Sequence, residues 1–256
     1  MNLKEKIAIV TGAGSGVGQA TAIRLAAAGA HVVINYNRSR TGAEETLERI
    51  AADGGAGDLF QADVADDAAA RALVAFAAER FGGLDILVNN AGVTEFIPFK
   101  DLDAVTDEVW QRLLGVNLLG PFHCARAAGE AMRDGGEIVN ISSVAGLASI
   151  GSSIPYAASK AALNSLTVAL ARTLAPKIRV NAVAPGFITG RWLEEGLGEH
   201  YEPVKQAFEA KVPLNRVCDP DDVAEAVLSL ITGSDLVTGQ TLTCDSGLLI
   251  MDPIGL

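Results

Sequence analysis

A chain of 256 residues is long enough for one large α/β domain or two small ones. Hydrophobic residues make up 49% of the chain and charged residues 20%, which allows a sizeable core and argues against disorder. The 20 Lys and Arg residues against 31 Asp and Glu give a formal net charge of −11, and no long basic run occurs. Neither nucleic acid nor an anionic membrane is therefore expected as a main partner.

The N-terminal segment "MNLKEKIAIVTG" begins a strand pattern at once, so we expect no signal peptide. No apolar run reaches membrane-spanning length, so we expect a cytoplasmic protein. Cys124, Cys218 and Cys244 are odd in number, far apart in sequence and without C-x-x-C spacing. They are expected to be small buried or half-buried thiols, and no metal site is predicted.

Short β-branched runs alternate with Ala-rich helical stretches along the chain. Strands are predicted at 6–12, 31–36, 84–92, 136–143 and 178–186, with weaker candidates at 57–64 and 238–247. Near-continuous apolar strands separated by helices predict an α/β fold, a Rossmann-type, doubly wound, mostly parallel seven-stranded sheet flanked by helices on both faces. No linker, charge block or repeat divides the chain, so residues 1–256 are expected to form a single dinucleotide-binding and catalytic domain.

The first predicted strand ends in the glycine-rich stretch "VTGAGSGVG", followed by an Ala-rich helix. Glycines at such a turn permit positive φ and let phosphates approach the backbone, while the helix N-terminus supplies free amides. This context predicts a dinucleotide site, although a glycine-rich turn can also serve tight packing alone. The candidate cofactor-binding residues of this turn are Gly12, Gly14, Ser15, Gly16, Val17 and Gly18.

The second predicted strand ends in "INYNRSR", without the acid that usually binds the ribose hydroxyls of NAD. A carboxylate would repel a 2′-phosphate, whereas Arg38, between Asn37 and Ser39, can pair with it. NADP(H) is therefore preferred as cofactor and NAD(H) is possible. The alternative is that "NRSR" is only a solvated basic turn.

Further candidates for the cofactor site follow the next two strands. Asp63, with Val64 beside it, can accept a hydrogen bond from the adenine amino group. The stretch "NNAG" places Asn90, Ala91 and Gly92 beside the middle of the cofactor.

In "SIPYAASKAALNSL", Tyr156 and Lys160 are four residues apart and share one face of a predicted helix. Pro155 suits the first turn, and Ser152 or Ser153 can cap it. A surface tyrosine with a neighbouring lysine is one interpretation of the pair. The other is catalytic: an ammonium stabilises a phenolate, so we expect Lys160, aided by the positive nicotinamide of the oxidised cofactor, to lower the pKa of Tyr156 from its ordinary value of about 10. Tyr156 would then act as general acid in carbonyl reduction and general base in oxidation.

Six motifs occur in order: "TGAGSGVG", "NNAG", "GVNLLGPFHCA", "ISS", "YAASK" and "RVNAVAPGFIT". Together they resemble single-domain short-chain dehydrogenases/reductases, particularly the 3-oxoacyl-carrier-protein reductases. The resemblance implies a catalytic tetrad of Asn117, Ser143, Tyr156 and Lys160. Two features depart from the family pattern: "DSG" replaces the usual "DGG" near the C-terminus, and Ser15 stands where some NADP-preferring relatives carry a basic residue.

The resemblance also implies roles for these residues. Ser143 would donate a hydrogen bond to the substrate oxygen, while Ser142 should face the other side of the strand. Asn117 would hold a water that links Lys160 to solvent, and Lys160 would hold the nicotinamide ribose. The further cofactor-binding residues implied are Tyr156, Lys160, Pro185, Gly186, Ile188 and Thr189. A homotetramer or homodimer is expected, which would pair helices 106–133 and 154–174 and pack the tail 248–256 on another subunit.

The least family-like segment, 190–217, is predicted to be an amphipathic lid over the substrate. Its apolar residues and the absence of clustered cations favour a medium-sized, largely neutral ketone or secondary alcohol. A carrier-bound 3-oxoacyl chain is the alternative, although carrier proteins are acidic and so is this chain. A second hypothesis is a catalytically silent nucleotide-sensing or scaffold protein on the same fold.

Overall fold

The computed structural model describes residues 1–251, within which seven strands form a single sheet in the order β3-β2-β1-β4-β5-β6-β7. The strands are β1 (Ile7–Val10), β2 (His31–Tyr36), β3 (Ala56–Gln61), β4 (Leu84–Asn89), β5 (Met132–Ile141), β6 (Ile178–Pro185) and β7 (Thr241–Cys244). All neighbouring strands are parallel. The predicted doubly wound fold is confirmed, and the sheet is wholly rather than mostly parallel. Both weak strand candidates are confirmed as β3 and β7, with shorter bounds.

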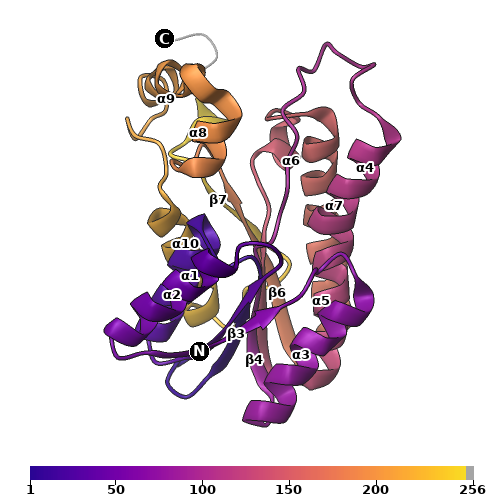
Figure 1. Ribbon diagram of the computed structural model, residues 1–256, viewed down its shortest axis with the longest axis vertical. Helices are drawn as coiled ribbons and strands as arrows, with labels where there is room; N and C mark the ends of the chain where they lie inside the picture. Colours follow the sequence, from indigo (N-terminus) through magenta and orange to yellow (C-terminus); the bar gives the residue numbers. More distant parts are fainter. Residues whose placement is uncertain (252–256) are drawn as a thin grey trace.

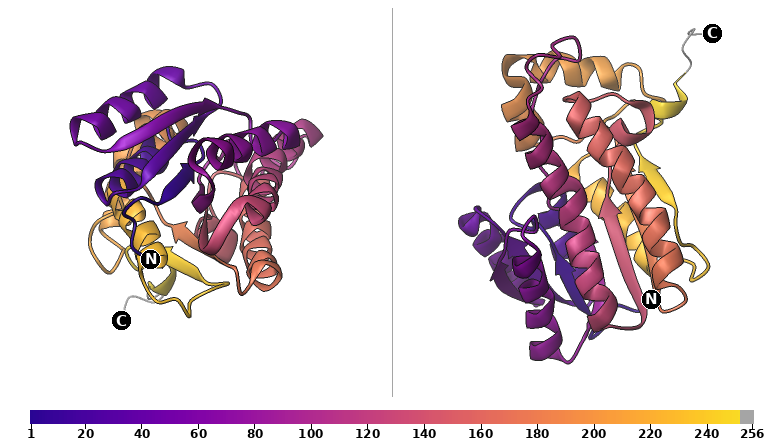
Figure 2. Two further views of the ribbon diagram at one scale, coloured as in Figure 1. Left: turned by 90° about the horizontal axis from the view of Figure 1, so that it is seen from below. Right: turned by 90° about the vertical axis from the view of Figure 1, so that its right-hand side faces the viewer.

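Helices cover both faces of the sheet (Figure 1). One face carries α1 (Gly16–Ala27), α2 (Arg40–Ala52) and α10 (Pro220–Thr232). The other carries α3 (Asp67–Phe81), α4 (Asp107–Leu114), α5 (Gly120–Ala131) and α7 (Ile154–Leu174). The short helices α6 (Ala145–Ala148), α8 (Arg191–Leu197) and α9 (Tyr201–Glu209) lie beyond the carboxyl ends of the strands, as Figure 1 and the right view of Figure 2 show. This is the edge at which such sheets bind ligands.

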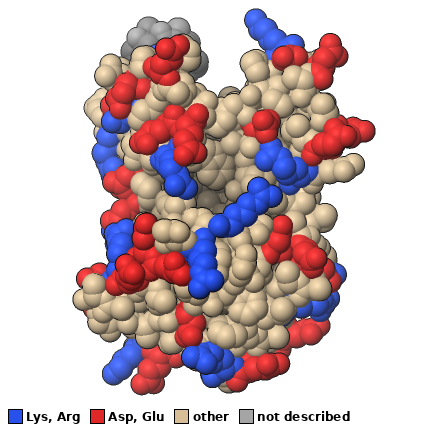
Figure 3. All heavy atoms as spheres, viewed as in Figure 1, with Lys and Arg blue, Asp and Glu red and all other residues tan. Residues whose placement is uncertain are grey.

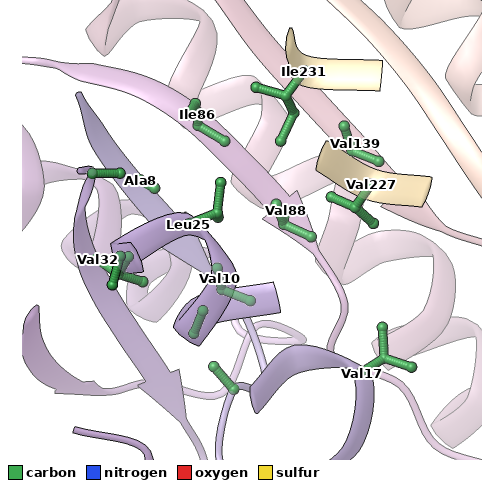
Figure 4. Packing of buried hydrophobic residues seen from close by; sticks show 14 of the residues in the cluster. Ala8, Val10, Val17, Leu25, Val32, Ile86, Val88, Val139, Val227 and Ile231 are labelled. Carbon is green, nitrogen blue, oxygen red and sulfur yellow. The ribbon is translucent and has the colours of Figure 1, made fainter. Parts of the chain in front are cut away.

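Alternation of side chains along the strands divides the core into two layers. Ala8 and Val10 of β1 point to one face, where they meet α1 and α10 through Leu25 and Val227 (Figure 4). Ile9 belongs to the layer on the opposite face. These five side chains are completely buried. Because β1 is buried on both faces, its sequence is a continuous apolar run, and its carboxyl end is held rigidly beneath the glycine-rich turn.

The helical run expected over 106–133 is present over 107–131 and contains one π-helical turn. Between α4 and α5, residues Gly115–Leu119 form a π-helical turn that carries the fully buried Asn117. Directly after it, Gly120 lets the helix approach Val64, because a Cβ there would lie 2.8 Å from Val64 Cγ2. The expected helical run is therefore confirmed over 107–131, with one π-helical turn inside it that the sequence did not indicate. Within residues 1–251, no helix has the length and apolarity that a bilayer crossing requires.

Candidate functional site

A cavity of about 920 Å³ opens where the carboxyl ends of the strands meet α8. Its lining runs from Asn37 and Asp63 at one end, past the glycine-rich turn, to Tyr156, Lys160 and the lid at the other. Figure 3 shows the hollow near the middle of one face, with side chains of both charges on its border. The cavity thus joins the two ends of the predicted dinucleotide site to the predicted catalytic residues.

The glycine-rich turn separates into residues that face the cavity and residues that pack. Gly12, Ser15, Gly16 and Val17 line it, and Gly16 has a φ of 54° with open space around the position of a Cβ. Gly18 does not line the cavity, because a Cβ there would overlap Asn90 Nδ2 and lie 2.6 Å from the Gly12 carbonyl oxygen. The same holds for the buried Gly14, where a Cβ would lie 3.1 Å from the Ser39 carbonyl oxygen. The structure thus places these two predicted cofactor residues outside the lining, in packing positions.

The N-terminus of α1 fits a phosphate group. Ser15 is its N-cap residue, yet its side chain makes no capping hydrogen bond, and the first turn contains no acidic residue. The amides of this turn therefore face the cavity with the favourable end of the helix dipole and without a competing carboxylate.

Three polar side chains hold the turn in this position. Asn90 Nδ2 donates to the carbonyl oxygens of Thr11, at 2.9 Å, and Gly12, at 3.1 Å. Thr11 Oγ1 accepts from the amides of Asn90 and Ala91. Asn35 Oδ1 accepts from the Gly12 amide at 3.2 Å, while its Nδ2 donates to the Ala62 carbonyl at 3.1 Å. A positioning role for Asn35 was not predicted; an amide in an otherwise apolar strand was the signal that could have indicated it.

At the far end of the cavity, Asn37, Asp63 and Val64 belong to the lining. Arg38 and Ser39 are exposed at its border instead, and Arg38 makes no ion pair within residues 1–251. The neighbouring Arg40 is paired with Glu44 at 2.8 Å. The middle of the cavity is lined by Asn90, Ala91 and Gly92, as expected. Beyond them lie Pro185, Gly186, Ile188 and Thr189 from the exit of β6.

Helix α7 carries the predicted catalytic pair into the cavity. Ser153 is its N-cap and accepts from the Tyr156 amide at 3.3 Å, with Pro155 in the first turn. Tyr156 is half-buried, while Lys160 is only 4% exposed, and both line the cavity. Lys160 Nζ donates to the Ile141 carbonyl at 2.8 Å and lies 5.8 Å from the centroid of the Tyr156 ring. The spacing of four residues therefore does bring both groups to one wall, as predicted.

The two serines after β5 differ in environment. Both belong to the cavity lining, and Ser143 Oγ accepts from the Ala145 amide at 3.1 Å. Ser142 Oγ donates to Asn164 Oδ1 at 2.6 Å, on α7. Ser143 is therefore the serine with a hydroxyl available toward Tyr156.

Burial has the largest effect on the pKa values of Tyr156 and Lys160. It raises the pKa of Tyr156 above its ordinary value, against the opposing effect of the Ser143 hydroxyl. It lowers the pKa of Lys160 to about 8. The ammonium of Lys160 is bound to the Ile141 carbonyl and lies 5.8 Å from the centroid of the Tyr156 ring, and in this arrangement it does not offset the effect of burial. The expected lowering of the pKa of Tyr156, which also depends on the positive nicotinamide, stays a prediction. A second positive charge near the phenol is needed to bring its pKa toward neutrality.

Asn117 lies behind the cavity wall. Its Oδ1 accepts from the Val93 amide at 2.8 Å, and its Nδ2 donates to the Val93 carbonyl at 2.9 Å and to Ser159 Oγ at 3.0 Å. The side chain therefore fixes Val93, which lines the cavity, against α7. This positioning role of the side chain was not predicted.

The mouth of the cavity lies between the segment after β4 and α8. Gly196 packs directly on the ring of Phe96, and a Cβ at Gly196 would overlap that ring. Glycines with positive φ, Gly190 and Gly198, flank α8, which buries none of its own residues. Of the predicted lid 190–217, the residues that line the cavity are Gly190, Arg191, Trp192, Leu193, Glu195 and Gly196.

Two arginines line this mouth, and each is paired with a glutamate from the same walls. Arg112 of α4 is paired with Glu95, and Arg191 Nε lies 3.4 Å from Glu195 Oε1. The apolar side chains of Phe96, Trp192 and Leu193 complete the mouth. The end of the cavity at α8 therefore offers apolar side chains, and its two arginines are each paired with a carboxylate.

Comparison with known proteins agrees with this geometry. A family model described as "Enoyl-(Acyl carrier protein) reductase" matches residues 12–249. A ketoacyl reductase named for the granaticin polyketide synthase of Streptomyces violaceoruber is 44% identical over 244 residues, which cover 94% of this chain and 95% of that protein. The 3-oxoacyl-[acyl-carrier-protein] reductase of a Synechocystis strain is 37% identical over 253 residues, covering 97% and 98%.

A solved structure is also similar. It is a short-chain dehydrogenase from Burkholderia cenocepacia J2315 in complex with NADP, 37% identical, with a TM-score of 0.87 over 96% of this chain and 99% of that one. The similarity in sequence and in fold extends over nearly the whole of each chain. This chain belongs to the short-chain dehydrogenase/reductase family of NAD(P)-dependent oxidoreductases.

Proposed function

We propose that the protein is an NADPH-dependent reductase of neutral ketones, with 3-oxoacyl thioesters as the favoured substrate class. The observation that carries the proposal is a single cavity whose lining contains Ser143, Tyr156 and Lys160 at one end and Asn37 and Asp63 at the other. The names of the Streptomyces and Synechocystis relatives support a 3-oxoacyl substrate.

The residues present fit NADP(H). The uncapped first turn of α1 would hold the pyrophosphate, and Asp63 with Val64 would contact the adenine. Arg38, exposed at the border and without an ion pair in the described chain, would bind the 2′-phosphate. The NADP complex of the Burkholderia relative supports this preference.

In the proposed reaction, Tyr156 donates its phenolic proton to the carbonyl oxygen as the carbon is reduced. Ser143 donates a hydrogen bond to the same oxygen and stabilises the charge that develops there. When bound, the cofactor supplies the hydride, and its oxidised form adds a positive charge near the phenol. Lys160 stabilises the phenolate that remains, and it can return a proton because burial lowers its pKa to about 8. Asn117 holds Val93, and with it the wall that faces Tyr156.

The substrate end favours a neutral molecule. Arg112 and Arg191 are each paired with a glutamate, so a carboxylate or phosphate on the substrate would have to displace that partner. Phe96 and Trp192 offer apolar contact for an acyl chain. The net charge of −11 disfavours attraction of an acidic carrier protein, so we expect turnover of small thioesters without a carrier.

The test is turnover of NADPH with a panel of 3-oxoacyl and 2-enoyl thioesters of N-acetylcysteamine and simple ketones. We expect the 3-oxoacyl thioesters to be reduced, with Tyr156→Phe lowering kcat by about 10²- to 10⁴-fold at unchanged NADPH affinity. Tyr36→Phe is the matched control: Tyr36 lies in β2, outside both the cavity lining and the proposed lid, and its substitution should leave kcat unchanged.

Other outcomes would replace the proposal. Preferential turnover of 2-enoyl thioesters would support the activity in the description of the matching family model instead. NADPH binding without turnover of any compound, the same in Tyr156→Phe, would support a silent nucleotide-binding protein.

Two structural predictions accompany the proposal. Segment 190–217 acts as a lid, with α8 moving between Gly190 and Gly198 in a chain that is otherwise one domain. The protein assembles as a homotetramer or homodimer, which light scattering would check. The tail that was expected to pack on another subunit lies partly outside the described residues, at 252–256.

A further inference from the structure

Two cysteines far apart in sequence lie side by side in the fold. Cys218 precedes α10, Cys244 ends β7, and their Sγ atoms are 4.0 Å apart. The thiol of Cys218 also donates to the Cys244 carbonyl at 3.1 Å. Cys218 is buried and Cys244 is half-buried, so solvent reaches the pair from the side of β7. Neither residue lines the cavity, and the proposed reaction uses neither.

The backbones of both cysteines hold the segment by which β6 leaves the sheet. The Gly186 amide donates to the Cys244 carbonyl at 2.9 Å, and the Thr189 amide donates to the Cys218 carbonyl at 2.8 Å. The Cys218 amide in turn donates to the Phe187 carbonyl at 3.0 Å. Gly186 and Thr189 line the cavity, so the thiol pair lies directly behind the proposed cofactor wall.

The surroundings also favour ionisation of one thiol. The hydrogen bond with Cys244, and to a lesser degree the Ser246 hydroxyl, lower the pKa of Cys218 to about 7 against the opposing effect of burial. The thiol of Cys124 is fully buried in α5, where desolvation raises its pKa to about 12. A thiolate is the nucleophile in thiol oxidation, so this lowering favours Cys218 over Cys124 as the attacking thiol.

We propose that Cys218 and Cys244 form a reversible redox pair that hydroperoxides close to a disulfide, and that closure weakens nucleotide binding in the adjacent cavity. The Cys218 thiolate attacks one oxygen of hydrogen peroxide, the O–O bond breaks and hydroxide leaves, which gives a sulfenic acid. The Cys244 sulfur then displaces water from that sulfenic acid and forms the S–S bond. In sum, two thiols lose two electrons and two protons, and one peroxide becomes two molecules of water.

We expect closure to move the wall. A disulfide requires an S–S distance of about 2.05 Å, so the two sulfurs approach each other by about 2 Å. Cysteine side chains are short, and the three backbone bonds above couple the cysteines to residues 186–189. The approach is therefore expected to displace Gly186 and Thr189. This coupling to nucleotide binding rests on the proposed function, whereas formation of the disulfide does not.

The experiment treats the native protein with hydrogen peroxide and maps its peptides without reduction, before and after dithiothreitol. We expect a linked peptide joining Cys218 to Cys244, absent in Cys218→Ser and Cys244→Ser but present in the matched control Cys124→Ser. In parallel, NADPH affinity is measured by fluorescence titration. We expect the oxidised wild type to bind NADPH at least about 3-fold more weakly than the reduced wild type, which is the effect of weakening one hydrogen bond. Treatment with dithiothreitol should restore the NADPH affinity.

The outcomes separate the two proposals. Absence of the linked peptide under native conditions would overturn the redox pair, and a linked peptide with unchanged NADPH affinity would overturn the coupling. A reduced wild type that binds no NADPH at all would instead contradict the proposed function, whatever the peptide map shows.

Discussion

Replacing Lys160 by Met should stabilise the protein while it impairs catalysis. Burial lowers the pKa of Lys160 from an ordinary 10.5 to about 8. At about 1.36 kcal/mol per pKa unit, the charged side chain costs the folded state roughly 3 kcal/mol at neutral pH. Loss of the hydrogen bond to the Ile141 carbonyl offsets about 1 kcal/mol of this. We expect Lys160→Met to raise the unfolding free energy at pH 7 by about 2 kcal/mol, or Tm by about 4–8 °C.

The sign of the pH dependence follows from the lowered pKa. Between about pH 8 and 10.5 the unfolded chain binds more protons at this lysine than the folded chain does, so wild-type stability rises with pH relative to the variant. The higher unfolding free energy of Lys160→Met relative to wild type should therefore be present at pH 7 and largely gone at about pH 9.5. Urea unfolding at both pH values measures it, with the exposed Lys100→Met as control. A variant less stable than wild type at pH 7 would refute the reasoning, because the hydrogen bond would then outweigh the charge.

Three further outcomes are expected. Gly18→Ala should destabilise the protein by about 1–3 kcal/mol in urea unfolding, since the new Cβ overlaps Asn90 and the Gly12 carbonyl; no loss of stability would contradict this packing. Arg38→Ala should raise KM for NADPH by about 10-fold or more with little change for NADH, and equal changes for both would exclude a contact with the 2′-phosphate. Burial raises the pKa of Glu137 to about 7, against the opposing effect of Arg179. The unfolding free energy of the wild type should therefore fall relative to that of Glu137→Gln as pH rises from 5 to 8. A difference in unfolding free energy that stays constant over this range in urea unfolding would contradict this.

Much of the fold was predictable because local patterns and global packing agree in it. The strand β1 is buried on both faces and therefore reads as an unbroken apolar run, which fixed its place in a parallel sheet. The π-helical turn at Gly115–Leu119 could not be predicted, because Asn117 within it bonds to Val93 and Ser159, which are distant in sequence.

The site was predictable where spacing alone brings groups together. Tyr156 and Lys160 share a helix face, so their common wall follows from four residues of separation. The raised pKa of Tyr156 did not follow from the spacing, since it depends on burial, which the hydrogen bond with Ser143 opposes. Contacts between elements that are distant in sequence could not be predicted either. The approach of Cys218 to Cys244 is one of them, because it depends on how α10 meets β7.

The most direct test concerns the proton of Tyr156. The chain has three tyrosines, so labelling them with ¹³C at Cζ and assigning one signal by Tyr156→Phe allows an NMR titration of this phenol. Without nucleotide, we expect its pKa to lie above the ordinary value, as burial dictates. With saturating NADP⁺ it should fall below that value in wild type but much less in Lys160→Met. A phenol that titrates at or above its ordinary pKa in the nucleotide-saturated wild type would contradict Tyr156 as the group that exchanges protons with the substrate.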